Sequence, residues 1–315
     1  MSTADKYDQP ARDQRFLANP AALLRALRPH QWIKNGLVFL PFVFSVRVAW
    51  SLDNLEAVPD LLLRLLLVFL AFCALSSATY LLNDLMDREG DRRHPVKSHR
   101  PIASGQVSVP VALAVMATLG LGGLAVTAWL DPVLAGIGLL YLGINVAYSL
   151  GMKRLVLLDL MAVASGYVIR ATAGAVAIDV TPSPWLYATT AAGALFIVLG
   201  RRYAEVRLAG DAPEEQRSVL RHYAGPFIGQ LLTISATAAW LSYTLYTIEA
   251  DNLPDNNSML LTLPIVTYGL FRYLYLLNTS QDAEAPEQLI VRDPPMLLSI
   301  LCWIGVSALV LLLNS

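Results

Sequence analysis

Residues 61–91 read LLLRLLLVFLAFCALSSATYLLNDLMDREGD, an apolar run that ends in a group of acidic residues. Beyond Arg64 the run carries no charged residue before Asp84, and as a helix it is long enough to span the hydrocarbon core of a bilayer. Its polar end presents four oxygen-bearing side chains at positions i, i+1, i+4 and i+8: Asn83, Asp84, Asp87 and Asp91. If the helix continues, a step of about 100° per residue places all four on one face.

A row of hard oxygen ligands at the end of an apolar helix is typical of a site for Mg²⁺ and for the phosphates that Mg²⁺ carries. For any single Asp, the alternative is an ordinary solvated helix end. The same segment continues with five basic residues: Arg88, Arg92, Arg93, Lys97 and Arg100. Acids aligned beside bases favour the functional interpretation. We therefore predict a Mg²⁺–diphosphate site whose metal ligands are Asn83, Asp84, Asp87 and Asp91.

The composition of the whole chain is that of a membrane protein. Of its 315 residues, 56% are hydrophobic and only 15% are charged, whereas a soluble domain carries about 25% charged residues. Its two cysteines, Cys73 and Cys302, lie in apolar runs without metal-ligand spacing, so we expect two buried free thiols. Residues 1–16 are charged and lack the apolar centre of a signal peptide.

Nine apolar segments predict an all-α polytopic membrane protein, since each is close to the roughly 20 residues that a bilayer core requires. They cover approximately 34–50, 60–82, 107–130, 132–150, 156–178, 184–200, 225–248, 258–277 and 295–313. We expect residues 34–315 to form a single transmembrane catalytic domain. Residues 1–33 would be a cytoplasmic tail and an interfacial segment, in which Leu23, Leu24 and Leu27 oppose Arg25 and Arg28.

The charges of the loops predict the orientation of the bundle. Basic residues gather near the N-terminus, in 83–106, at Lys153 and Arg154, in 201–223, and at Arg272 and Arg292. The alternate connections, near 51–59, 131, 179–183 and 249–257, contain no Lys or Arg. We expect a multi-pass protein of the plasma (inner) membrane, and by the positive-inside rule its C-terminus, Ser315, lies outside. Its N-terminus and its polar loops, with any active site, then face the cytoplasm.

Further candidate residues lie in the loops that follow. Pro95 and Pro101 restrain the backbone around Lys97 and Arg100, which we expect to point back toward the carboxylates and to neutralise a diphosphate. The turn that begins at Tyr148 carries Lys153 and Arg154. For Arg154, a role in orienting the protein is as good an interpretation as substrate binding.

Asp159 and Arg170 stand inside a predicted span. They are eleven residues apart, about three helical turns, and so share one face of a helix. Ionisable groups within a span usually face a polar cavity, which favours a functional role for Asp159. For Arg170, a structural pair that bridges to other helices is an equal alternative.

A last cluster ends the predicted span 184–200 and comprises Arg201, Arg202, Tyr203 and Glu205. Arg201 and Glu205, at i and i+4, share a helix face. The cluster is either a phosphate clamp or a solvated helix terminus, and for residues 213–217 we favour the solvated alternative. None of the four histidines, His30, His94, His99 and His222, has metal-ligand spacing.

These stretches resemble the UbiA superfamily of intramembrane prenyltransferases. Its first acidic motif, Asn-Asp-x-x-Asp-x-x-x-Asp after the second helix, stands here as Asn83, Asp84, Asp87 and Asp91. An Arg-Pro-x-x-Ser-Gly element follows in many members and stands here as Arg100, Pro101, Ser104 and Gly105. The Lys-Arg turn after the fourth helix and the count of nine helices also match, so the resemblance covers nearly the whole chain.

One part of the chain departs from the prenyl-transferring members. They carry a second aspartate motif near the end of the sixth helix, where this chain has Arg201-Arg202-Tyr203-Ala204-Glu205. Arginines suit a bare phosphate better than a second Mg²⁺. Together with residues 28–35, RPHQWIKN, they resemble the branch that makes decaprenylphosphoryl-5-phosphoribose for arabinan-containing bacterial cell walls.

The resemblance implies a Mg²⁺-dependent transfer of 5-phosphoribosyl from phosphoribosyl pyrophosphate to decaprenyl, or another polyprenyl, phosphate. Asp84, Asp87 and Asp91 then hold the metal and the pyrophosphate, and Asn83 orients them. Charge on the leaving group is stabilised by Lys34, Lys97 and Arg100. Either the ribose 5-phosphate or the lipid phosphate is held by Arg201, Arg202 and Lys153. The candidates for ribose hydroxyls are Asp159, Tyr203 and Glu205. Further substrate-binding candidates are Asn35, Tyr148, Arg154 and Arg170.

The implied partners are the two substrates and membrane lipids. No nucleic acid is expected, and homo-oligomer formation is left open. The nearest alternative is a prenyltransferase that moves a polyprenyl group from its diphosphate to an aromatic or other acceptor, with the same acidic motif binding the lipid's diphosphate. A transporter that uses Asp159 and Arg170 as relay groups is a different class. It predicts inverted repeats with matched broken helices, and no convincing pair is present.

Overall fold

The computed structural model describes residues 19–46, 48–51, 55–181, 183–209, 222–223, 225–250, 252–254, 256–280, 289 and 292–313. Over these ranges the chain is helical and has no strand, apart from an isolated bridge between Val46 and Trp50. The predicted all-α fold is therefore confirmed. Residues 1–18 of the predicted cytoplasmic tail and the segment 213–217 lie outside the described residues. So do parts of the connections 51–59 and 249–257, including their acidic residues Asp53, Asp251 and Asp255.

The N-terminal elements pack on the bundle and are continuous with it. Helix α1 (Pro20–Leu27) is capped by the Asn19 side chain, which accepts the Ala21 N–H at 3.1 Å. Its buried residues Ala22 and Ala26 contact Leu81 of the next long helix. The 3₁₀ helix η1 (Pro29–Phe39) and the single turn α2 (Leu40–Val43) follow. The domain boundary predicted between residues 33 and 34 thus falls inside η1.

Helix α3 (Val58–Met86) is the long apolar helix of the acidic motif. It is followed by α4 (Arg88–Arg93), and the residue between the two helices, Asp87, forms a turn. The Asp87 N–H donates to the Asn83 carbonyl at 2.9 Å, and the Asp91 N–H donates to the Asp87 carbonyl at 2.8 Å. This continuity keeps Asn83, Asp87 and Asp91, three of the four residues for which the spacing predicts a common face, on one side of the helix. The short 3₁₀ helix η2 (Lys97–His99) then turns the chain back.

Three further helices surround α3. They are α5 (Val109–Leu130), α6 (Pro132–Leu150) and α7 (Leu158–Ala177), and the 3₁₀ turn η3 (Met152–Arg154) precedes α7. Small residues let these elements approach closely. A Cβ at Gly123 of α5 would lie 2.8 Å from Cγ of Leu75, and a Cβ at Gly174 of α7 would lie 2.0 Å from the carbonyl oxygen of Val38.

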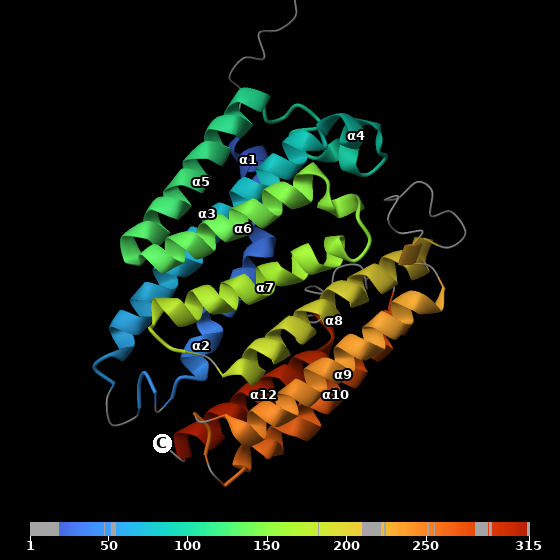
Figure 1. Cartoon of the computed structure of the whole chain (residues 1–315). Helices are drawn as coiled ribbons and strands as arrows, with labels where there is room; N and C mark the ends of the chain where they lie inside the picture. Colours follow the sequence, from blue (N-terminus) through green and yellow to red (C-terminus); the bar gives the residue numbers. More distant parts are fainter. Residues whose placement is uncertain are drawn as a thin grey trace, which may run out of the picture.

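The second half of the chain forms another layer of helices. It comprises α8 (Pro184–Ala209), α9 (Pro226–Glu249), the 3₁₀ turn η6 (Ser258–Thr262), α10 (Leu263–Thr279) and α12 (Pro294–Leu313). Asp293 joins two of them, because it pairs with Arg272 of α10 at 2.8 Å and accepts the N–H of Met296 in α12 at 2.9 Å. Figure 1 shows α3, α5 and α6 on one side, α8, α9, α10 and α12 on the other, and α7 between them.

Seven of the described helices are long and apolar enough to cross a membrane: α3, α5, α6, α7, α9, the η6–α10 unit and α12. They match seven of the nine predicted segments. The predicted segment 184–200 is a helix, α8, which is outside these seven and runs on to Ala209. The predicted segment 34–50 is the 3₁₀ helix η1 followed by one α-turn, and Trp50 folds back to donate to the Phe42 carbonyl. The expected burial is correct for Cys73 and wrong for Cys302, which is exposed on α12.

Candidate active site

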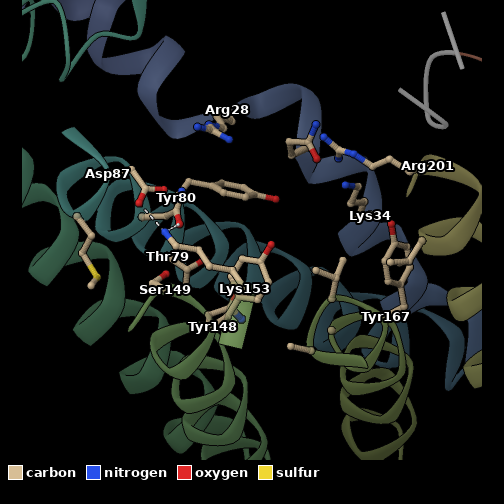
Figure 2. Close-up of a pocket in the computed structure, with 18 of the residues that line it drawn as sticks. Arg28, Lys34, Thr79, Tyr80, Asp87, Tyr148, Ser149, Lys153, Tyr167 and Arg201 are labelled. Carbon is tan, nitrogen blue, oxygen red and sulfur yellow. Dashed lines mark hydrogen bonds and ion pairs between the residues drawn. The ribbon is translucent and has the colours of Figure 1, made fainter. Parts of the chain in front are cut away.

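The ends of several helices enclose a polar cavity of about 1040 Å³. Its wall comes from the C-terminal ends of α3, α6 and α8, from α4, and from η1 and the N-terminal half of α7. In Figure 2, Asp87, Tyr80 and Lys153 lie in one part of this cavity, and Lys34, Tyr167 and Arg201 lie in another. The cavity therefore has two charged regions, which we call the acidic end and the arginine end.

The acidic end consists of the motif carboxylates and the cations that neutralise them. Asp87 pairs with Lys153 of η3 at 2.5 Å. Asp91 pairs with Arg100 at 2.7 Å, and the same guanidinium lies 3.2 Å from Asp84. As predicted, Arg100 points back to the carboxylates. The contact between Lys153 and Asp87 was not predicted, because the Lys-Arg turn is 66 residues away along the chain.

Arg28 is a residue of the acidic end that the sequence interpretation missed. Its guanidinium donates to Asp84 at 2.6 Å and lies 5.1 Å from the ring centroid of Tyr80. Its backbone is left-handed, at φ 55 and ψ 59, and this conformation ends α1 and turns the chain into η1. The available signal was its position directly before Pro29, at the end of an amphipathic segment.

At the arginine end, two carboxylates hold Arg202 in place, and one of them, Asp159, is buried. Arg202 is 5% exposed and pairs with Asp159 of α7 at 2.9 Å. It also pairs with Glu205, which in turn pairs with Arg201 at 3.1 Å. Arg201 and Arg202 line the cavity, whereas the two carboxylates are outside its lining. Tyr203 points elsewhere, and its hydroxyl donates to Asn278 of α10 at 2.7 Å.

Tyr223 completes this support from a segment far along the chain. Its hydroxyl donates to Asp159 at 2.6 Å and accepts the Leu157 N–H at 2.7 Å. Burial raises the pKa of Tyr223, and the hydrogen bond to Asp159 raises it further. The phenol therefore stays protonated and keeps donating to the carboxylate that holds Arg202. Leu157 itself lies at φ 69, directly before the start of α7.

Arg170 forms a separate buried network, and it does not pair with Asp159. Its Nε donates to Asn35 at 2.6 Å, and its other nitrogens donate to the Gly166 carbonyl at 2.6 Å and to the Tyr141 hydroxyl at 3.0 Å. The guanidinium also lies 4.9 Å from the centroid of the Tyr141 ring. The structural alternative for Arg170 thus agrees with its contacts, although the residue also lines the cavity.

The structure brings most of the candidate residues to one cavity. Those that line it are Lys34, Asn83, Asp87, Asp91, Lys97, Arg100, Tyr148, Lys153, Arg154, Arg170, Arg201 and Arg202. Those outside its lining are Asn35, Asp84, Asp159, Tyr203 and Glu205. Lining residues that the sequence interpretation missed include Arg28, Tyr80, Tyr141, Asn145, Tyr167 and Arg292. Most of these are uncharged residues within apolar helices, where nothing in the sequence separates a cavity side chain from a packed one.

The acidic end fits a metal ion that arrives with a phosphate. Among the described residues, no three His, Cys, Asp or Glu side chains converge into a preformed metal cluster. Asn83, Asp87 and Asp91 face the cavity from successive turns, whereas Asp84 is 2% exposed and held by Arg28 and Arg100. Mg²⁺ usually takes one or two carboxylates and completes its shell with substrate phosphates and water. The donor set suits such a partial site.

A second, apolar cavity of about 450 Å³ adjoins the arginine end. It lies between η1, α2, α8, α10 and α12. Aliphatic and aromatic side chains form most of its wall, including Leu37, Phe44, Leu186, Phe196 and Trp303. A cavity of this kind suits a hydrocarbon chain.

The fold and the site define a family of intramembrane transferases. A model of the UbiA prenyltransferase family matches residues 38–311, and the chain belongs to that family. Several similar proteins are named decaprenyl-phosphate phosphoribosyltransferase. That of Mycobacterium tuberculosis is 35% identical over 285 residues, covering 90% of this chain and 92% of that protein. That of Mycolicibacterium smegmatis is 33% identical over 293 residues (90% and 91%), and that of Corynebacterium glutamicum 32% over 286 residues (90% and 84%).

Solved structures show the same fold at low sequence identity. A UbiA homolog from Archaeoglobus fulgidus bound to DMAPP and Mg²⁺ matches with a TM-score of 0.67 at 18% identity, over 92% of this chain and 99% of that chain. A UbiA homolog from Aeropyrum pernix K1 matches with a TM-score of 0.62 at 20% identity, over 89% and 97%. The predicted UbiA-like architecture is confirmed.

Proposed function

We propose that this protein transfers the 5-phosphoribosyl group of phosphoribosyl pyrophosphate to a polyprenyl phosphate, such as decaprenyl phosphate, and releases pyrophosphate. The observation that carries this proposal is one cavity with an acidic end for a metal-bound diphosphate, a cationic end for a bare phosphate, and an adjoining apolar cavity. Relatives with this activity in their names align over 90% of the chain, which supports the same assignment.

The acidic end would hold the pyrophosphate. Asp87 and Asp91, with Asn83, would hold a Mg²⁺ ion, which neutralises the diphosphate and makes it a better leaving group. Lys97, Arg100 and Lys153 would donate to the phosphoryl oxygens and stabilise the charge that grows as the bond breaks. Asp84 would act indirectly, because its contacts with Arg28 and Arg100 position the latter.

The reaction needs no strong base. A phosphate oxygen of the lipid attacks C1 of the ribose while the bond from C1 to the pyrophosphate oxygen breaks, and the bonding electrons leave with pyrophosphate. A phosphate monoester has its second pKa near 6, so the attacking group is already ionised at neutral pH. The protein's contribution is then to hold two anionic substrates in one geometry and to offset their mutual repulsion.

The proposed setting is the plasma membrane, with the cavity open to the cytoplasm. The cavity end of the bundle carries the basic residues Arg100, Lys153 and Arg202, in agreement with the positive-inside rule for a cytoplasmic face. Phosphoribosyl pyrophosphate is soluble and would enter from that side. The product would supply arabinose units to arabinan-containing cell walls.

The function can be tested with the purified protein in detergent. Labelled phosphoribosyl pyrophosphate, decaprenyl phosphate and Mg²⁺ should give a labelled lipid and pyrophosphate in equal amounts. Asp87→Asn should lower the rate about a hundredfold or more, since it removes charge where the metal would bind. The matched control is Asp60→Asn, because Asp60 is an exposed residue at the other end of α3. If the wild-type protein forms no ribosylated lipid, the proposal is wrong.

A second candidate is prenyl transfer from a polyprenyl diphosphate. It is favoured by the likeness to the Archaeoglobus fulgidus homolog, which was solved with DMAPP and Mg²⁺. Under this alternative the acidic end would hold the lipid's own diphosphate. Incubation with a labelled polyprenyl diphosphate and an aromatic acceptor separates the two candidates, since only this one predicts a prenylated acceptor.

A further inference from the structure

The polar and the apolar cavity meet at a defined place. Three residues line both of them: Lys34 of η1, Tyr167 of α7 and Ile197 of α8. Among the described residues that line the apolar cavity, Lys34 is the only cation. If one ligand occupies both cavities, the junction between its polar part and its apolar part therefore lies beside Lys34.

One face of α8 runs from the apolar cavity into the polar cavity. Leu186, Thr190, Gly193 and Ile197 line the apolar cavity at spacings of three or four residues, which places them on one face of the helix. Arg201 follows at the next such position and lines the polar cavity. From Leu186 to Arg201 the helix rises roughly 22 Å, a length that accommodates several isoprenoid units.

The wall formed by η1 and α2 has the same order of side chains, with a cation followed by apolar residues. Lys34 lies near the polar end, and the next residues of this wall to line the apolar cavity are Leu37, Leu40 and Phe44. Two walls from distant parts of the sequence thus each carry a cation at the polar end and apolar side chains beyond it. This arrangement is complementary to an anionic head on a hydrocarbon chain.

Lys34 also lies apart from the leaving-group site. Figure 2 shows Lys34, with Arg201 and Tyr167, separated from the Asp87–Lys153 pair at the acidic end. The nucleophile of a displacement must approach the reacting carbon from the side opposite the leaving group. If the pyrophosphate lies at the acidic end, the attacking phosphate therefore lies on the other side of the ribose, in the region of Lys34.

We propose that Lys34 and Arg201 bind the phosphate of the acceptor lipid, with its first isoprenoid units in the apolar cavity between η1 and α8. This inference rests on the proposed function and assigns its acceptor site. It also changes the role of Lys34, which the family resemblance places at the leaving group. Arg201 reaches this phosphate while Glu205 fixes its guanidinium from behind.

The first test compares Michaelis constants. Lys34→Gln should raise the KM for polyprenyl phosphate about tenfold, the expected loss for one charge-assisted hydrogen bond, and leave the KM for phosphoribosyl pyrophosphate nearly unchanged. Lys97→Gln, at the acidic end, should do the reverse. If Lys34→Gln instead raises mainly the KM for phosphoribosyl pyrophosphate, Lys34 belongs to the donor site and the inference is wrong.

A binding measurement provides a readout without turnover. The wild-type protein should bind decaprenyl phosphate more tightly than decaprenol, and in Lys34→Gln this difference should shrink about tenfold. An unchanged difference would overturn the assignment even if activity falls.

The position of the tail is tested at Gly193. A Cβ there would meet no atom within 4 Å, so Gly193→Leu fills space in the apolar cavity without a clash of its Cβ. It should raise the KM for decaprenyl phosphate and affect geranyl phosphate, which has two isoprenoid units, much less. The matched control is Gly143→Leu on α6, where a Cβ also meets nothing and the residue is exposed. Equal effects on both lipids, or equal effects of the two variants, would contradict the proposed tail site.

Failure of this inference differs from failure of the function. If the wild-type protein forms no ribosylated lipid, the function itself is wrong. If it forms the product with the same lipid KM as Lys34→Gln and Gly193→Leu, the function stands and only the acceptor site is wrong.

Discussion

At the scale of the residue, charge pairing in the acidic end depends on Arg28. Its guanidinium supports Asp84, which is 2% exposed, and its left-handed backbone turns α1 into η1. These two roles can be separated, because glycine adopts a positive φ without steric cost. A glycine at this position keeps the turn and removes the guanidinium, with its contacts to Asp84 and to the Tyr80 ring.

We predict that Arg28→Gly lowers the free energy of unfolding by about 1–3 kcal/mol, since Asp84 loses one of its two cationic partners. Thermal unfolding in detergent measures this change. Adding Asp84→Asn should recover part of the loss, because the unpaired charge is gone. Arg25→Ala, which removes an exposed guanidinium that donates to Gln106, serves as the control. If Arg28→Gly unfolds at the wild-type temperature, Arg28 contributes nothing to the support of Asp84.

At the scale of the element, the start of α7 carries the arginine end. Leu157 precedes the helix at φ 69, an unfavourable conformation for a residue with a Cβ. Its N–H is bonded by Tyr223, and the same hydroxyl bonds Asp159 in the first turn of the helix. One phenol therefore fixes both the entry into α7 and the carboxylate that holds Arg202.

Tyr223→Phe should keep the stacking of its ring on Phe227 and remove both hydrogen bonds. We expect a loss of stability of about 1–3 kcal/mol, the cost of leaving buried partners unsatisfied. We also expect a higher KM for one phosphate substrate with little change in kcat, because Arg202 is held less firmly. Steady-state kinetics and thermal unfolding measure these effects. Tyr268→Phe, at an exposed tyrosine, is the control, and equal behaviour of the two variants would exclude the positioning role.

At the scale of the whole molecule, the cavity exists because α7 lies directly on η1. The close approach at Gly174 brings the two backbones together, and Arg170, one turn earlier on α7, then reaches Asn35. This contact holds η1, with Lys34, against the centre of the bundle. The packing of α7 on η1 thus decides the position of a residue of the candidate site.

Gly174→Ala should disrupt the fold, because the new Cβ would lie 2.0 Å from the Val38 carbonyl oxygen and a backbone must move. We expect little monodisperse protein in size-exclusion chromatography and a strongly lowered unfolding temperature. Gly143→Ala, also within a helix but with open space at its Cβ, should be at least as stable as the wild type. Normal yield and unfolding temperature for Gly174→Ala would show that η1 can withdraw at no cost.

Much of the molecule was predictable from local patterns. The hydropathy of the segments predicted the seven described helices that are long and apolar enough to cross a membrane, since the length and composition of a segment decide whether it can span a bilayer. The spacing predicted one common face for Asn83, Asp84, Asp87 and Asp91. Three of them, Asn83, Asp87 and Asp91, line the cavity, because the helical hydrogen bonds continue through Asp87, whereas Asp84 lies outside the lining. The 3₁₀ geometry of η1 was not predictable, since hydropathy does not distinguish it from an α-helix.

The amino-acid sequence by itself determined the class of protein, the location of the acidic motif and the excess of cations around it. Only the tertiary structure decided which cation meets which carboxylate and where Lys34 lies. The partners Arg28 and Asp84 are 56 residues apart in the sequence. Lys153 and Asp87 are 66 residues apart, and Arg170 and Asn35 are 135 residues apart. Hydropathy and helical spacing act within one segment. These contacts form only when distant helix ends converge, and close packing between helices decides that convergence.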